Sequence, residues 1–353
     1  METTTETSAP SELLLPVKLG TEVYGEGKKV VNLSFAQFTN DAGGVDAGQE
    51  KVKPKRIVVF PMGWPWDASA KATYDFPGQI AKGLDTTCLS ISTRSQRDNP
   101  EGLALQGEAM YQCLLKNGLD QETQLIIIGH SAGALKGAYL DKVLEDNGFK
   151  PALFILVSPM GLNSRSTVGL LKDFLVDTFW TGKKERQKGG VRAGDKNPVA
   201  EKVTEQEIQA GFKDSLRKKW QAGGVRGLWS QIKSLVTKDP IFSQIKVPVV
   251  DLANDRDMVS NHRSYLPEEA VRNNVAPLTP EADARARQNE RVQIARAREQ
   301  IAREIFKQAE SVKVVVPTRQ ADHNGIPVAR GEQVPSLIKR VLSLAERAAR
   351  RAT

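Results

Sequence analysis

A serine lies between two glycines near the middle of the chain, in the pentapeptide Gly129-His130-Ser131-Ala132-Gly133. An apolar run precedes the pentapeptide and a segment compatible with a helix follows it, an order that places the serine on a sharp turn between a buried strand and a helix. Glycines are needed on both sides because a Cβ there would clash where the strand and the helix cross. The pattern predicts that Ser131 is a nucleophile whose hydroxyl faces the positive end of the helix dipole.

A serine hydroxyl needs a base that takes its proton, and histidine is the base suited to neutral pH. The chain contains three histidines. His130 precedes Ser131 within the turn, so we expect its side chain to point away from the hydroxyl and to pack beneath the turn. His262 comes soon after the next-to-last predicted strand, where a surface or supporting position is the simpler interpretation. His323 follows the last predicted strand, which brings it to the same sheet edge as Ser131, and we expect it to be the base.

A serine–histidine pair needs an acid that accepts a hydrogen bond from the far imidazole nitrogen and fixes the tautomer, and the chain around the next-to-last predicted strand offers candidates. The segment that begins with this strand, 247–257, contains three carboxylates. Asp251 falls within the predicted strand itself, whereas Asp255 and Asp257 lie in the turn beyond it. The residues alone leave the choice open.

The serine turn, the acid region and the histidine after the last strand together resemble the α/β-hydrolase family, over about residues 53–347 with two large insertions. The family carries its triad in the chain order serine, acid, histidine. The resemblance therefore implies Ser131 as nucleophile, Asp257 as acid with Asp255 as its rival, and His323 as base. The separation between Asp257 and His323 is longer than is typical of the family, because a charged helix is predicted between them.

Acyl transfer through a serine needs two backbone amides aimed at the developing oxyanion. One is expected from Ala132, at the start of the helix. The resemblance implies that the other comes from the loop after the predicted strand 56–60, where the family often has His-Gly before an apolar residue. This chain reads Met62-Gly63-Trp64. Methionine replaces the histidine, and the amide of Trp64 is the candidate donor.

The fold that must position these residues is predicted from short, continuous apolar runs separated by helical stretches. Continuous rather than alternating apolarity indicates strands buried on both faces, hence an α/β fold with a mostly parallel central sheet flanked by helices. The chain has 353 residues, of which 40% are hydrophobic, enough for one large domain with an added cap. Residues 17–38 are predicted to form two more strands with a turn at 24–27. The continuous runs are 56–60, 87–91, 125–128, 152–157, 247–252 and 312–316.

Two insertions interrupt this pattern. Residues 160–244 hold helical fragments and no convincing strand, which predicts a helical cap between core segments 12–159 and 245–353. Residues 280–310 predict a long charged helix before the last strand, while residues 1–11 are polar and are expected to be disordered. Four tryptophans lie near the predicted oxyanion loop or in the predicted cap and suggest an apolar substrate pocket there. They are Trp66, Trp180, Trp220 and Trp229.

Cys88 and Cys113 fall in a predicted strand and a predicted helix, so we expect buried thiols rather than a disulfide or a metal site. No cofactor or metal is expected, because no Cys/His pair has zinc-ligand spacing. The N-terminus lacks the pattern of a secretory signal and no apolar run reaches about 20 residues, which favours a soluble, cytoplasmic protein without a membrane span.

The net charge of +8 is concentrated on the predicted cap. A solvated face is the simpler interpretation, and attraction of an anionic substrate or peripheral membrane contact is the alternative. Nucleic-acid binding is not expected, because acids balance the arginines of the long helix.

These features together predict a serine hydrolase that cleaves a carboxylic ester or thioester with an apolar acyl group. An acyltransferase would use the same site with a different acceptor. A non-catalytic protein that binds through the basic cap and the long helix is the alternative from another class, since fold does not fix function. The natural substrate and the oligomeric state are not readable from the sequence.

Overall fold

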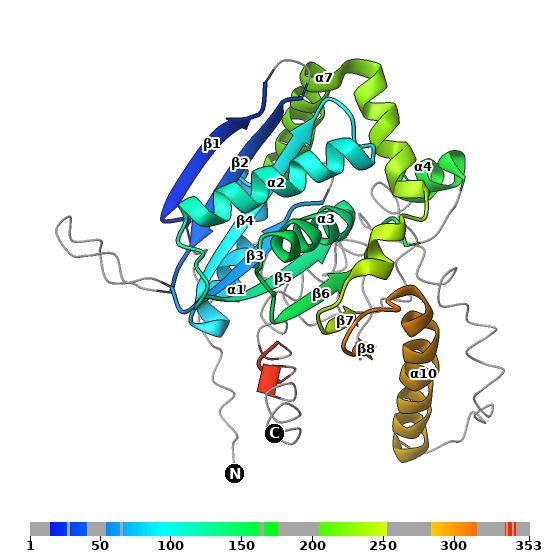
Figure 1. Cartoon of the computed structure of the whole chain (residues 1–353). Coiled ribbons are helices and arrows are strands. Elements are labelled where there is room, and N and C mark those ends of the chain that lie inside the picture. Colours follow the sequence, from blue (N-terminus) through cyan, green and yellow to red (C-terminus); the bar gives the residue numbers. More distant parts are fainter. Residues whose placement is uncertain are drawn as a thin grey trace, which may run out of the picture.

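The computed structural model describes residues 15–26, 29–40, 54–63, 66–162, 166–175, 205–252 and 284–315, together with 336, 338–340 and 342–343. The segment expected to be disordered, residues 1–11, lies outside them. One eight-stranded sheet, in the order β1-β2-β4-β3-β5-β6-β7-β8, organises the described chain (Figure 1). Its strands are β1 Lys18–Tyr24, β2 Val31–Phe38, β3 Arg56–Pro61, β4 Thr87–Ser95, β5 Gln124–His130, β6 Leu153–Val157, β7 Val249–Leu252 and β8 Val312–Val315.

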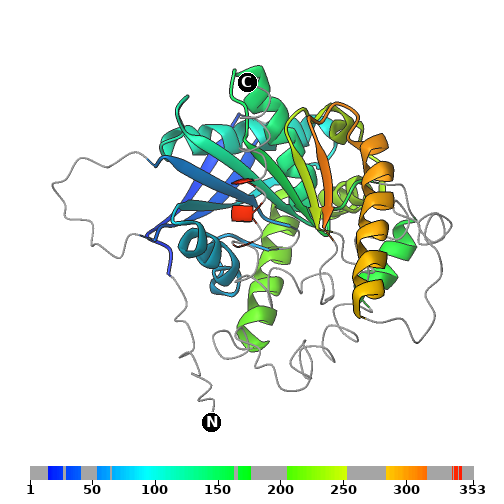
Figure 2. The ribbon, with the colours of Figure 1, turned by 90° about the horizontal axis from the view of Figure 1, so that it is seen from below.

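The sheet is mostly parallel, as the continuous apolar runs predict. β2 pairs antiparallel with both β1 and β4, and every pairing from β4 through β8 is parallel. The helices between the strands cover both faces of the sheet (Figures 1 and 2). Those of the core are α1 Asp75–Leu84, α2 Pro100–Lys116 and α3 Ala132–Asp146.

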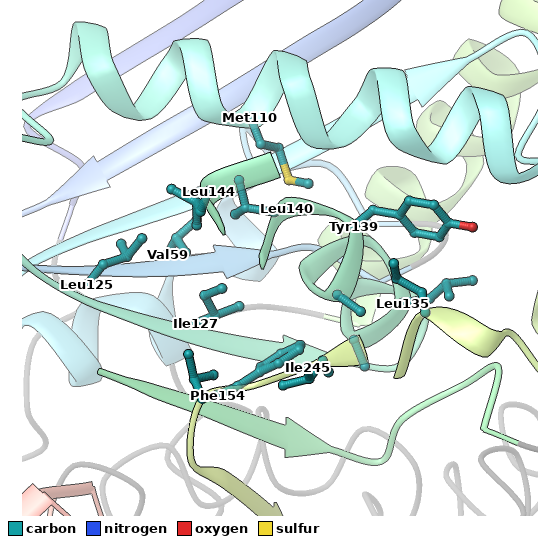
Figure 3. Packing of buried hydrophobic residues seen from close by; sticks show 14 of the residues in the cluster. Val59, Met110, Leu125, Ile127, Leu135, Tyr139, Leu140, Leu144, Phe154 and Ile245 are labelled. Carbon is teal, nitrogen blue, oxygen red and sulfur yellow. The ribbon is translucent and has the colours of Figure 1, made fainter. Parts of the chain in front are cut away.

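Two hydrophobic clusters lie on opposite faces of the sheet. Alternate residues of β3 divide between them: Ile57 and Val59 belong to one cluster, and Val58 and Phe60 to the other. The first cluster packs under α2 and α3, as Figure 3 shows for residues around Ile127. The second packs under α1 and includes buried residues of the C-terminal segment, Ile338 and Leu342.

Cys88 lies in β4 and Cys113 in α2, and both are buried free thiols, as predicted. Burial raises the pKa of Cys113 to about 12, so that its thiol stays protonated at neutral pH.

β4 is longer than its apolar run. The apolar run ends at residue 91, but the polar residues 92–95 continue the strand and pair with β2. Their side chains are tolerated inside because Gln106 of α2 accepts a hydrogen bond from Thr93 at 2.7 Å and donates one to Ser95 at 2.9 Å. Hydropathy patterns carry no signal for such a buried polar network.

The described part of residues 160–244 is helical, in α4 Thr167–Leu175, α7 Glu205–Val236 and the short 3-10 helix Pro240–Gln244. The sequence predicts two helical fragments here, 205–220 and 228–236, and α7 consists of two helices that meet at a kink at Gly224, where the backbone leaves helical geometry. Figure 1 shows α7 beside the end of the sheet toward which the β4 arrow points.

The charged helix before the last strand is α10, Ala284–Ile305. The first residues of the predicted range 280–310, up to residue 283, lie outside the described residues. Arg298 and Ala302 near its C-terminal end and Phe306 just beyond it are buried, and Ile301 and Ile305 are partly buried against the same hydrophobic cluster. Phe306 meets Phe242 edge to face, with ring centroids 6.1 Å apart. This end of α10 therefore packs on the body of the protein, beside β8.

Candidate active site

Ser131 occupies the sharp turn between β5 and α3 that the sequence predicts. Its backbone has φ 55° and ψ −127°, a conformation that residues with a side chain rarely adopt. A Cβ at Gly129 would overlap the Cα of Ala134, and one at Gly133 would overlap the carbonyl oxygen of Pro61. The two glycines thus let strand, turn and helix cross at close range, and the turn holds the serine in a strained position.

Backbone hydrogen bonds fix the turn on both sides. The amide of Ser131 donates to Val157 of β6 at 3.1 Å, and the carbonyl of Ser131 accepts from Met160 and from Ala134, each at 3.1 Å. α3 begins at Ala132 and has no acidic residue in its first turn. The partial positive charge of its N-terminus is therefore not neutralised there by its own side chains.

The loop after β3 lies directly against this turn. A Cβ at Gly63 would stand 3.0 Å from Ser131 Cβ and 3.5 Å from His130 Nδ1. His130 is the last residue of β5 and is buried, on the side of the turn that faces Gly63. Trp64, the predicted amide donor, lies outside the described residues.

Met62, which stands where the family often has histidine, continues the pairing between β3 and β4. Its amide donates to Ile91 at 2.8 Å, and its buried sulfur accepts a hydrogen bond from Ser90 at 3.0 Å. The methionine is thus anchored in the core beside the start of the loop.

The ends of four parallel strands are aligned at the edge that carries Ser131. His130 pairs with Val157, Val157 pairs with Leu252, and Leu252 pairs with Val315. The chain beyond β7 and the chain beyond β8 therefore leave the sheet in the same row as the serine turn. The predicted acids and histidines of those segments lie outside the described residues: Asp255, Asp257, His262 and His323. Asp251 is inside β7, as expected, and is fully buried.

Comparison with known proteins gives a structural match only. No protein family and no curated protein matches the sequence. A serine hydrolase involved in carbazole degradation superposes with a TM-score of 0.51 at 11% identity, over 93% of this chain and 100% of that chain. At this identity the likeness shows the fold. The chain has the α/β-hydrolase fold.

Two further solved structures are similar. A probable hydrolytic enzyme from Pseudomonas aeruginosa PAO1 has a TM-score of 0.47 and 13% identity, over 93% of this chain and 94% of that chain. An esterase from Pyrobaculum calidifontis has a TM-score of 0.47 and 11% identity, over 95% of this chain and 87% of that chain.

Within this α/β-hydrolase fold, a buried carboxylate organises the loop after β3. Asp67 accepts from Arg94 of β4 at 2.5 Å, from Lys218 of α7 at 3.1 Å, and from the backbone and hydroxyl of Ser69 at 3.0 and 2.9 Å. Burial alone would raise the pKa of Asp67, but the Arg94 charge and the Ser69 donors outweigh it and hold the pKa well below its usual range. Asp67 is therefore a carboxylate at neutral pH.

Sequence reasoning missed this cluster. Asp67, Arg94 and Lys218 are far apart in the chain, and neither charge pattern nor hydropathy links them. The available signal was weak: an aspartate just beyond the predicted oxyanion loop, in a segment otherwise poor in charge.

The described helices of residues 160–244 pack next to the serine turn of the α/β-hydrolase fold. Ala132, the residue after the proposed nucleophile, belongs to a small apolar cluster with residues of α4, α7 and the chain after β6. Its other buried members are Met160, Leu170, Leu235 and Val236.

The tryptophans of the predicted pocket are placed differently from one another. Trp66 is partly buried against the core, whereas Trp220 and Trp229 of α7 are 54% and 59% exposed. Trp180 lies outside the described residues. In the described structure, α7 thus presents two indole rings to solvent, and a place for them in a pocket stays a prediction.

Among the described residues, no helix combines the length and the apolar character that crossing a membrane requires.

Proposed function

We propose that the protein is a serine hydrolase that cleaves a carboxylic ester or thioester with an apolar acyl group. The observation that carries the proposal is the backbone of Ser131, which is held at φ 55° between a buried strand and a helix N-terminus. Strain of this kind costs about 1–3 kcal/mol and persists where function requires it. A purely structural serine has no need of such a turn.

In the proposed reaction, Ser131 Oγ attacks the carbonyl carbon while His323 takes the hydroxyl proton. The amides of Ala132 and Trp64 stabilise the oxyanion of the tetrahedral intermediate. Its collapse expels the alcohol or thiol, which receives the proton from His323. Water then attacks the acyl-enzyme by the same steps, and Asp257 orients the imidazole throughout.

The aligned strand ends support this assignment. Neighbouring strands are about 4.8 Å apart, so the ends of β7 and β8 lie about 10 and 14 Å from the end of β5. Asp257 is five residues beyond Leu252, and His323 is eight residues beyond Val315. Extended chains of these lengths reach about 17 and 27 Å, which is enough for both side chains to meet Ser131.

The apolar preference is inferred from the helices of the insertion. Leu170 of α4 and Leu235 of α7 pack with Ala132, so apolar side chains surround the N-terminus of α3. We propose that residues 160–244 act as a cap on a core of residues 12–159 and 245–353. An acyl chain held beneath it would gain about 0.8 kcal/mol for each methylene removed from water.

The test combines a fluorophosphonate probe with hydrolysis of p-nitrophenyl butyrate. The wild-type protein should be labelled at Ser131. Ser131→Ala should abolish labelling, and Ser131→Ala and His323→Ala should each lower the rate of ester hydrolysis about a thousandfold or more while the protein stays folded. His262→Ala serves as the matched control and should cost far less. Full activity in either triad variant would refute the assignment.

A further inference from the structure

One face of α7 contacts the loops at the carboxyl ends of β3 and β4. Lys218 binds Asp67, and a Cβ at Gly223 or Gly227 would stand 2.6 or 2.9 Å from the carbonyl oxygen of Gln96. One turn farther along, Ser230 accepts a hydrogen bond from the amide of Asp98 at 3.1 Å. The helix is therefore fitted closely to these loops over several turns.

The last turns of α7 reach the other side of the serine turn. Ile232, Leu235 and Val236 pack in the apolar cluster that contains Ala132. α7, which is kinked at Gly224, thus touches the loop after β3 and the start of α3, the two regions from which the oxyanion donors are proposed to come. It contacts the loop after β3 through Lys218 and the start of α3 through its C-terminal end.

The link from Lys218 to the serine is short. Asp67 is 3% exposed and its carbonyl accepts from Ala70 at 3.0 Å, while the amide of Trp66 donates to Gly63 at 3.0 Å. Hydrogen bonds thus brace the chain on both sides of Asp67, and Gly63 lies against Ser131. A displacement of Asp67 would be passed to Gly63 through the neighbouring Trp66, whose amide is hydrogen-bonded to the carbonyl of Gly63.

Arg94 and Lys218 bind the same oxygen of Asp67 from different sides. Arg94 belongs to β4 and anchors Asp67 to the sheet at 2.5 Å, whereas Lys218 ties it to α7. Burial lowers the pKa of Lys218, but its hydrogen bonds to Asp214 and Asp67 outweigh burial and raise it. The amine is therefore charged at neutral pH, and its ion pair with Asp67 links the loop to the helix.

We propose that Lys218 is a positioning residue: its ion pair with Asp67 couples α7 to the loop that starts at Gly63 and so holds the oxyanion donors against Ser131. This inference rests on the function proposed above. Oxyanion stabilisation depends on donors placed within about 0.5 Å of the productive geometry. Loosening the helix from the loop should therefore lower the rate of the chemical step more than the affinity for substrate.

The experiment compares Lys218→Met, which keeps the length of the side chain and removes its charge, with Lys218→Arg, which keeps the charge. Lys213→Met, an exposed lysine of the same helix, is the control. We expect Lys218→Met to lower kcat for p-nitrophenyl butyrate about tenfold, with KM changed less than twofold and the fluorophosphonate labelling rate reduced in parallel. Lys218→Arg should retain at least half of the wild-type kcat, and Lys213→Met should match wild type.

A double variant tests the route. If Lys218 acts through Asp67, adding Lys218→Met to Asp67→Asn should cause no further loss of kcat, provided that thermal melts show both proteins folded. If Asp67→Asn does not fold, the comparison of Lys218→Met with Lys218→Arg decides alone. A Lys218→Met protein with kcat within twofold of wild type, or with a change in KM only, would overturn this inference. A wild-type protein that neither hydrolyses the ester nor is labelled at Ser131 would instead overturn the proposed function.

Discussion

Gly133 lies so close to the carbonyl oxygen of Pro61 that a Cβ on the glycine would overlap that oxygen. α3 is thereby pressed against the end of β3, next to Ser131. We predict that Gly133→Ala destabilises the protein by about 3 kcal/mol or more, because neither backbone can move without disturbing the sheet. Urea unfolding measures the effect.

Gly137→Ala, one turn farther along α3, is the matched control. Its Cβ would lie 3.1 Å from side-chain atoms of Ile127 and Phe154, which can shift, and alanine favours a helix by about 1 kcal/mol over glycine. Its stability should stay within about 1 kcal/mol of wild type. Equal stability of the two variants would show that the turn tolerates more movement than its geometry implies.

The second prediction concerns the effect of backbone strain at Ser131 on stability. A residue without Cβ adopts φ 55° and ψ −127° at little cost, so Ser131→Gly should be about 1 kcal/mol more stable than Ser131→Ala. Both variants should lack esterase activity. Thermal melts of the two proteins measure the difference directly, and an alanine variant that is the more stable of the two would argue against strain at this position.

How far the sequence predicts this protein can be judged from particular residues. The turn at Ser131 was predictable because its two glycines, its apolar strand and its helix are all local features. The parallel sheet was predictable because strands buried on both faces leave continuous apolar runs, such as Leu153–Val157 of β6. Both predictions rest on short-range patterns, which a single sequence is enough to show.

What the sequence did not predict depends on contacts between distant segments. Residues 92–95 look like a loop in the sequence, but β2 pairs with them and Gln106 forms hydrogen bonds with the hydroxyls of Thr93 and Ser95. Arg298 looks like part of a solvated face, yet it is 4% exposed. The ion pairs of Asp67 join the loop after β3 to β4 and α7, and no periodicity links these places.

A third prediction concerns the pH dependence of stability. Asp141 of α3 is 5% exposed, and burial, aided by the nearby Glu145 charge, raises its pKa to about 7. Between about pH 4 and pH 7 the folded state then binds more protons than the unfolded state, so stability falls as pH rises through this window, by up to about 1.4 kcal/mol per pH unit.

Asp141→Asn removes that ionisation. The variant should be more stable than wild type by a few kcal/mol at pH 8, and the gain should shrink as pH falls toward 5. Asp146→Asn is the control, since Asp146 is 58% exposed and its pairing with Lys142 is worth little. Urea midpoints at pH 5 and pH 8 decide the matter, and a gain that does not change with pH would contradict the prediction.

The last prediction separates the two acids proposed after β7. Leu252 ends the strand in the row of the serine turn, and both Asp255 and Asp257 follow within five residues. An asparagine in place of the true triad acid leaves the protein folded but stabilises the wrong imidazole tautomer, which lowers kcat by about four orders of magnitude. We expect this loss for Asp257→Asn and less than a tenfold loss for Asp255→Asn, measured with p-nitrophenyl butyrate on variants whose thermal melts match wild type. The reverse pattern would assign the acid to Asp255, and equal small losses would exclude an acid from this segment.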